Sequence, residues 1–123
     1  MSADDLELAR QFLDVLAGAA TTGDREAIYP LLAPDIEWVT PQRELHGIEA
    51  ARDELTWISP RETLDVEYDE LQVTDLGEGR IMSSVHETFR MKGTGAFAYA
   101  RDRQIDLTIR DGKIVRYEMR IVG

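Results

Sequence analysis

Cysteine is absent from this chain of 123 residues, and histidine occurs only twice. The absence of cysteine excludes a disulfide framework, a thiolate nucleophile and a cysteine-ligated zinc, and two histidines are too few for a histidine-rich metal site. Long apolar runs are lacking too, since none approaches the roughly 20 residues of a membrane span. Asp4, Asp5 and Glu7 stand where a signal peptide would be basic. We therefore expect a soluble cytoplasmic protein with no metal ion.

Positive charge is scarce as well. Lys and Arg number 14 against 24 Asp and Glu, so the formal net charge is −10 at pH 7. Such a field repels phosphate backbones and anionic lipid surfaces, so neither a nucleic-acid partner nor a membrane partner is expected. The length suits a single domain over residues 1–123, and a hydrophobic content of 43% suffices for a core.

Apolar residues recur at helical spacing in three segments of the first half. They predict three helices, which begin at Ser2, Asp24 and Gly47. Pro30 removes a backbone donor and shortens the second helix, which we extend to Leu32. Ser59-Pro60 ends the third. Residues 35–40 alternate in polarity and predict a short strand.

Alternating patterns after residue 63 predict about four long strands joined by glycine-containing turns. The strands begin at Leu64, Arg80, Ala96 and Ile114. A loss of phase at Asp69-Glu70 indicates a β-bulge. The chain is thus predicted to be an α+β domain, with three N-terminal helices packed on a curled antiparallel sheet.

The same alternation predicts which side chains face the helices. Odd positions of 115–121 are apolar or amphipathic, whereas the even positions between them are charged, so the odd positions face inward. Residues 105, 107 and 109 share that face. Carried back through the hairpins, this register pairs three odd positions of neighbouring strands: Glu87 with Arg101, Phe89 with Tyr99, and Met91 with Phe97. Arg103 lies beside the first pair.

A carboxylate and two guanidiniums that face the helices are costly unless they are paired or wetted by a cavity. Glu87, Arg101 and Arg103 therefore have two interpretations. As a structural feature they form an ion-pair cluster near the open end of the sheet. As a catalytic site, one guanidinium polarises a substrate oxygen while Glu87 moves a proton.

An alternative register gives His86 the catalytic role. A two-residue turn at Gly93-Thr94 would shift the pairing by one residue and bring His86 inward as an acid and base. In the register that we predict, His86 is instead a hydrogen-bonded surface residue.

Aromatic residues such as Trp38 and Tyr117 are typical of a small α+β core. They become pocket residues if the curled sheet leaves a cone too wide to fill with side chains. On that hypothesis six residues form a resting surface for an apolar substrate: Trp38, Thr40, Phe89, Tyr99, Tyr117 and Met119.

The order of these elements resembles the SnoaL-like branch of the nuclear transport factor 2-like superfamily. The resemblance is carried by Gly23-Asp24, Leu32-Ala33-Pro34-Asp35, Gly47-Ile48-Glu49-Ala50 and Arg110-Asp111-Gly112-Lys113-Ile114. It implies a cone-shaped α+β fold, a pocket between helices and concave sheet, and frequent homodimers. Members include ketosteroid isomerases, polyketide cyclases, limonene epoxide hydrolase, dehydratases and proteins without known activity, so the fold does not specify the reaction.

The ketosteroid isomerase apparatus is mostly missing. The resemblance places Leu16 at the phenol donor of that family and Thr40 at its general-base Asp. Asp106 matches the oxyanion-hole Asp, but the predicted register turns it outward, opposite Arg116. The chain is therefore not expected to be a standard ketosteroid isomerase.

Two other family sites are incomplete as well. Met119 stands where limonene epoxide hydrolase has an Asp in its final strand. An Asp and His pair of the cyclase type would be formed by Asp106 and His86 only in the alternative register.

The function predicted is the binding of a small apolar metabolite in the cone, with cofactor-free acid/base catalysis as its enzymatic form. Alternatives are an isomerase, polyketide cyclase or epoxide hydrolase/dehydratase, and a non-catalytic dimerisation module. A homodimer is expected through the convex sheet face, because the small side chains of Ala96, Ala98 and Ala100 allow another sheet to approach closely.

Overall fold

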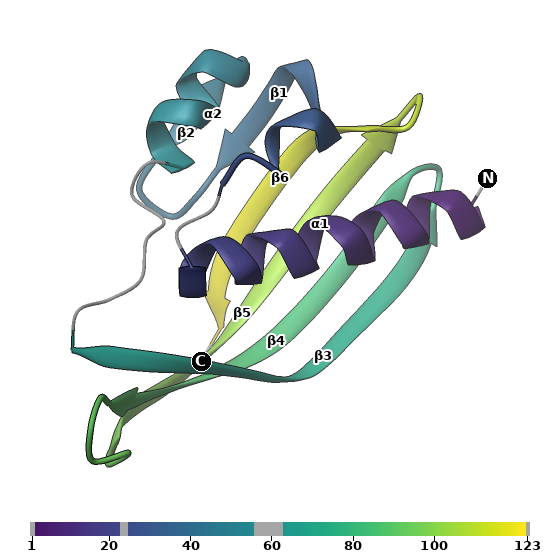
Figure 1. Cartoon of the computed structure of the whole chain (residues 1–123). Coiled ribbons are helices and arrows are strands. Elements are labelled where there is room, and N and C mark those ends of the chain that lie inside the picture. Colours follow the sequence, from purple (N-terminus) through teal and green to yellow (C-terminus); the bar gives the residue numbers. More distant parts are fainter. Residues whose placement is uncertain (1, 23–24, 56–62, 123) are drawn as a thin grey trace.

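The computed structural model describes residues 2–22, 25–55 and 63–122 (Figure 1). The elements, in chain order, are α1 (Ser2–Thr22), a 3-10 turn η1 (Tyr29–Leu31), β1 (Leu32–Val39), β2 (Glu44–His46), α2 (Ile48–Leu55), β3 (Leu64–Gly77), β4 (Arg80–Met91), β5 (Phe97–Arg110) and β6 (Lys113–Val122). No helix in these ranges is both long and apolar enough to cross a membrane.

One six-stranded sheet, in the order β2-β1-β6-β5-β4-β3, forms the body of the molecule. The sheet curls, and α1 lies across the face formed by β3 to β6, while α2 lies at the β1 and β2 end (Figure 1). Neighbouring strands of the sheet pair antiparallel, with the exception of β1 and β6, which pair parallel. The predicted α+β class is confirmed, but the prediction of a wholly antiparallel sheet was wrong.

Three N-terminal helices are not found in the described residues. The second predicted helix is reduced to turns and the three residues of η1, which contain Pro30. Pro30 has no N–H to donate, and Leu32 already pairs with Ile114 of β6, so the chain is extended two residues later. Asp24 and Ser59-Pro60, the predicted start of the second helix and end of the third, lie outside the described residues.

The register predicted at the centre of the sheet is confirmed. Glu87 pairs with Arg101 and Phe89 with Tyr99. The β-bulge predicted at Asp69-Glu70 is present as a register shift between Asp69 and Gln72.

The register predicted near two hairpins was wrong by one residue. Beyond Phe89 the pairing shifts, so Arg90 and not Met91 lies opposite Phe97. A second shift, between Thr108 and Ile109, brings Ile114 opposite Ile109. Ile114 is therefore fully buried, in the place predicted for Val115. Each shift absorbs an extra residue close to a turn, where strand alternation alone carries no signal.

Three aromatic side chains form part of the core where α1 meets β1 and β6. Trp38 stacks on Tyr117 with ring centroids 3.8 Å apart, and Phe12 of α1 meets both rings edge-on. All three side chains are at most 3% exposed. Side chains thus fill this end of the curl, which the sequence hypothesis left open for a ligand.

Candidate functional site

The predicted polar group on the inward sheet face is formed. Glu87 of β4 is 2% exposed. Its Oε1 accepts a hydrogen bond of 2.6 Å from Nε of Arg101, and Nε of Arg103 lies 3.1 Å from the same oxygen. The strand register causes this arrangement, because Arg101 lies opposite Glu87 and Arg103 is the next inward residue of β5. We call these three residues the Glu87 cluster.

The Glu87 cluster has more positive than negative charge. Two guanidiniums share one carboxylate oxygen, which leaves a formal charge of one positive unit. Nε of Arg103 is buried and within ion-pair distance of Glu87, yet it makes no hydrogen bond to any residue that the structure describes. Arg101 also lies over the ring of Phe89, at 5.3 Å from its centroid. Glu87 therefore has two guanidinium partners, whereas Arg103 shares its carboxylate partner with Arg101.

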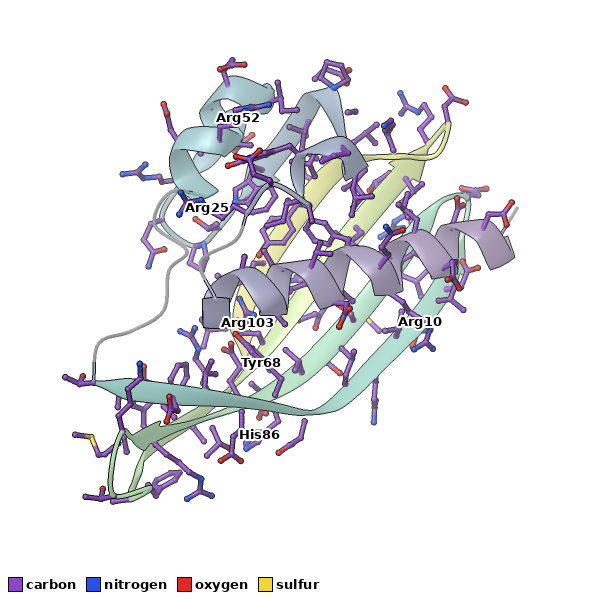
Figure 2. All side chains as sticks on the ribbon, in the orientation of Figure 1. Arg10, Arg25, Arg52, Tyr68, His86 and Arg103 are labelled. Carbon is purple, nitrogen blue, oxygen red and sulfur yellow. The ribbon has the colours of Figure 1, made fainter. Side chains whose placement is uncertain are left out.

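Arg103 connects this cluster to a cleft between α1 and strands β3, β4 and β5. The cleft has a volume of about 590 Å³. Its apolar walls are Leu13, Leu16, Ala17, Leu71, Val85 and Ile105. Its inner polar groups are Arg103 and Tyr68, both on the α1 side of the sheet (Figure 2). The exposed charged residues Glu7, Arg10 and Asp14 of α1 border it. We call it the α1 cleft.

Tyr68 was not among the residues predicted from the sequence. It pairs with Glu87 across β3 and β4, so Tyr68, Glu87 and Arg101 form one row across three strands. Extending the predicted register one strand further, from β4 to β3, would have placed Tyr68 opposite Glu87 on the inward face.

His86 and Asp106 are not brought together. His86 lies on the sheet face opposite Tyr68 and α1 (Figure 2), and its Nδ1 is 2.7 Å from Oδ1 of Asp102. Asp106 instead pairs with Arg120 and accepts a hydrogen bond of 3.2 Å from Nε2 of Gln104. The alternative register, with His86 inward, is therefore not the one adopted.

Arg116 is also placed differently from the prediction. It lies opposite Thr108, and its side chain pairs with Glu37 and Glu118 in place of Asp106. Burial alone would lower the pKa of Arg116, but its hydrogen bonds to Glu37 and Glu118 outweigh burial and raise the pKa above the ordinary value. This ion-pair group belongs to the face away from α1.

The six residues predicted to support a substrate are spread over the molecule. Trp38 and Tyr117 stack within the core, and Met119 packs against that core. Phe89 and Tyr99 stack at 4.4 Å beside Arg101. The Oγ1 of Thr40 is buried with no hydrogen-bond partner among the described residues. Of all the predicted site residues, Arg103 is the one that lines the α1 cleft in the described ranges.

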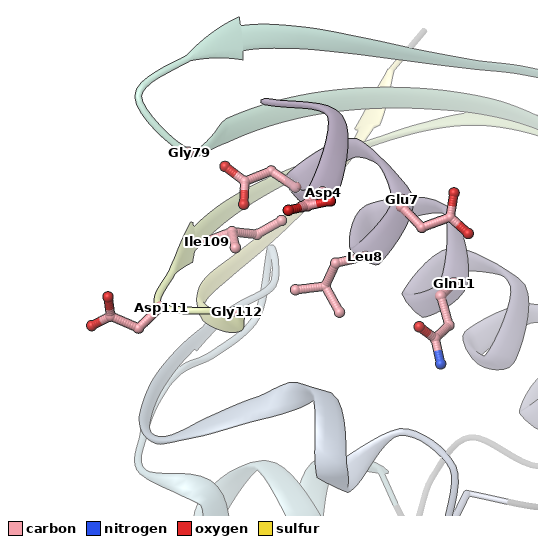
Figure 3. A pocket seen from close by; sticks show the side chains of 9 residues that line it. Asp4, Glu7, Leu8, Gln11, Gly79, Ile109, Asp111 and Gly112 are labelled. Carbon is pink, nitrogen blue, oxygen red and sulfur yellow. The ribbon is translucent and has the colours of Figure 1, made fainter. Parts of the chain in front are cut away.

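A second cavity, of about 550 Å³, lies between the start of α1 and two hairpin turns (Figure 3). Its charged lining residues, as far as the structure describes them, are all acidic: Asp4, Asp5, Glu7 and Asp111. Within the described ranges, no three His, Cys, Asp or Glu side chains are grouped so as to hold a metal ion. Among the residues described around this cavity there is no Lys or Arg, whereas the α1 cleft is lined by Arg103 and Arg10.

The comparisons with known proteins agree with the architecture. The family model of the SnoaL-like domain matches residues 9–117. A nuclear transport factor 2-like protein from Anabaena variabilis has a TM-score of 0.79 and 18% identity, over 100% of this chain and 93% of that chain. A second such protein, from Burkholderia xenovorans LB400, has a TM-score of 0.73 and 22% identity, over 99% and 92%.

A third similar structure, from Jannaschia sp. CCS1, is described as a candidate SnoaL-like polyketide cyclase. Its TM-score is 0.74 and its identity 18%, over 98% of this chain and 87% of that chain. At such identities the likeness shows the fold alone. No protein of curated function matches the sequence.

Proposed function

The chain belongs to the SnoaL-like domain family, and from that premise we propose that its α1 cleft binds a small, largely apolar metabolite. The observation that carries the proposal is the combination of an apolar cleft of about 590 Å³ with one inward guanidinium, that of Arg103. Concave sites of this size, with apolar walls and few convergent polar groups, are typical of small-molecule binding.

The Glu87 cluster supports an enzymatic form of this function. A guanidinium at the floor of a cleft stabilises negative charge that develops on a substrate oxygen. Oε1 of Glu87 lies 3.1 Å from Nε of Arg103, so a substrate oxygen that draws Arg103 away opens this carboxylate to a substrate proton, while Arg101 keeps its hydrogen bond to the same oxygen. In this scheme Arg103 and Glu87 are the catalytic pair, Arg101 holds Glu87 in place, and no cofactor takes part.

Ligand binding is tested first by thermal shift with terpenoid, steroid and polyketide fragments. We expect at least one fragment to raise the melting temperature, because a ligand that binds only the folded state stabilises it. Ala17→Leu adds bulk to the cleft wall on α1 and is expected to abolish the shift.

Ala27→Leu is the matched control, since Ala27 is exposed and does not line the cleft. It should keep the full shift. If no fragment stabilises the protein, or if both variants respond like the wild type, the α1 cleft is not the binding site.

We also propose a homodimer formed through the convex face of the sheet. Ala98 and Ala100 of β5 are exposed, and they alternate with the inward residues Tyr99 and Arg101. A stable interface buries about 1,200–2,000 Å² in total, which the broad face of a six-stranded sheet can supply.

Sedimentation equilibrium at micromolar concentration should therefore give twice the chain mass of 13.9 kDa. Ala100→Arg is expected to shift the equilibrium to monomer, because a long charged side chain in place of a methyl group would keep the partner sheet from approaching closely. The exposed control Ala27→Arg should remain dimeric. A monomeric wild type would contradict the proposal.

A further inference from the structure

We infer that the ligand of the α1 cleft is a monocarboxylic acid with an apolar body, and that the guanidinium of Arg103 binds its carboxylate. The inference rests on the proposed function and specifies the class of substrate. It begins from the charge of the Glu87 cluster, where one buried carboxylate faces two guanidiniums. Excess buried charge is costly, and a second anion at this point would compensate it.

The other anionic side chains that the structure describes near the cleft do not supply that second charge. Glu7 and Asp14 border the cleft from α1, but both are exposed to solvent and neither forms an ion pair with Arg103 in the described structure. Asp102, the neighbour of Arg103 in β5, lies on the other face and pairs with His86. The positive charge of Arg103 is therefore available to an anionic ligand in the α1 cleft.

The contact between Arg103 and Glu87 leaves the outer part of the guanidinium available. Glu87 is approached by Nε, so the fork of the two terminal Nη groups is not used by that carboxylate. Such a fork matches the two oxygens of a carboxylate and binds them in a bidentate manner. The side chain of Arg103 is only 15% exposed, so water screens this interaction little.

The walls of the cleft define the rest of the ligand. Leu13, Leu16, Val85 and Ile105 surround the approach to Arg103 with apolar surface. A neutral apolar compound would cover the guanidinium without adding a counter-charge to the one it shares with Arg101, whereas an acid supplies a second carboxylate. Phosphate esters are disfavoured, because a second negative charge would meet a border of two acids and one base, Glu7, Asp14 and Arg10, in a chain of net charge −10.

The test compares acids with their uncharged amides of nearly equal shape. The probes are 4-phenylbutanoate, octanoate and 2-naphthylacetate, each beside its primary amide, titrated calorimetrically into the full chain at pH 7. We expect at least one acid to bind about tenfold more tightly than its amide, the usual effect of one charge-assisted hydrogen-bonded contact. In Arg103→Met the acid and amide should bind equally.

Arg120→Met is the matched control, because it removes one positive charge from the opposite sheet face. It should keep the tenfold preference. Arg103→Lys keeps the charge without the fork and is expected to reduce the preference several-fold, which gives a second measurement if Arg103→Met does not fold.

The results separate this inference from the proposed function. If fragments or amides bind in the α1 cleft but no acid is preferred, the inference is overturned and the proposed function stands. A preference that survives in Arg103→Met overturns the assignment to Arg103. If neither the fragments nor any acid or amide binds, the proposed function fails, and the inference fails with it.

Discussion

Replacing Glu87 with Ala is expected to lower the free energy of unfolding by about 3–5 kcal/mol, measured by urea denaturation at neutral pH. The substitution removes the carboxylate that Arg101 and Arg103 share and leaves two guanidiniums without a counter-charge. Glu87 is 2% exposed, whereas the side chains of Arg101 and Arg103 are 32% and 15% exposed, so the carboxylate is the most deeply buried member of the cluster.

The matched control is Glu67→Ala, which breaks a carboxylate and guanidinium pair at the surface. Glu67 pairs with Arg90 at 2.9 Å, and the two side chains are 56% and 40% exposed. Its loss should cost less than about 1 kcal/mol, because water solvates both partners. If Glu87→Ala costs no more than Glu67→Ala, the Glu87 cluster is solvated and is not a buried ion pair.

Gly79→Ala is expected to destabilise the fold by about 3 kcal/mol, the sum of left-handed backbone strain and one lost hydrogen bond. Gly79 has a φ of +77°, and a Cβ at this position would lie 2.2 Å from the carbonyl oxygen of Ile109. The same contact includes a hydrogen bond of 2.7 Å from the Ile109 N–H to the Gly79 carbonyl. The added methyl group must therefore push β4 away from β5.

Gly93→Ala separates backbone strain from the clash. Gly93 has a φ of +88°, but a Cβ there would meet nothing within 4 Å. We expect a loss of about 1 kcal/mol from strain alone. Both variants are compared by thermal and urea unfolding. Equal losses would show that β4 and β5 can separate at Gly79 without cost.

The central register was predictable because local alternation determines it. In β4 and β5 one face must be buried, and a slip of one residue would expose every apolar side chain of that face. The pairing of Glu87 with Arg101 followed from this constraint. The helical content was less predictable from the sequence. The chain at Leu32 is extended because it pairs with Ile114, a distant partner that no local pattern reveals.

The cleft was only partly predictable, for a related reason. Strand alternation identified Arg103 as an inward residue, but the position of α1 over the sheet decides which inward residues remain accessible. Phe12 covers Trp38 and Tyr117 and makes them core, while the wall of Leu13 and Leu16 leaves space over Arg103. Helix periodicity predicts an apolar stripe on α1 but not where that stripe lies on the sheet.

The parallel pairing of β1 with β6 has a consequence for the order of folding. Glu37 and Arg116, which pair across these strands, are 79 residues apart in the chain. During synthesis β1 emerges early, and its neighbour in the centre of the sheet is made last. Until β6 arrives, β1 has only the three residues of β2 as a strand partner, and its buried face, with Ile36 and Trp38, is exposed. Closing such a distant contact is slow, so β1 keeps one edge without a strand partner until β6 has been made.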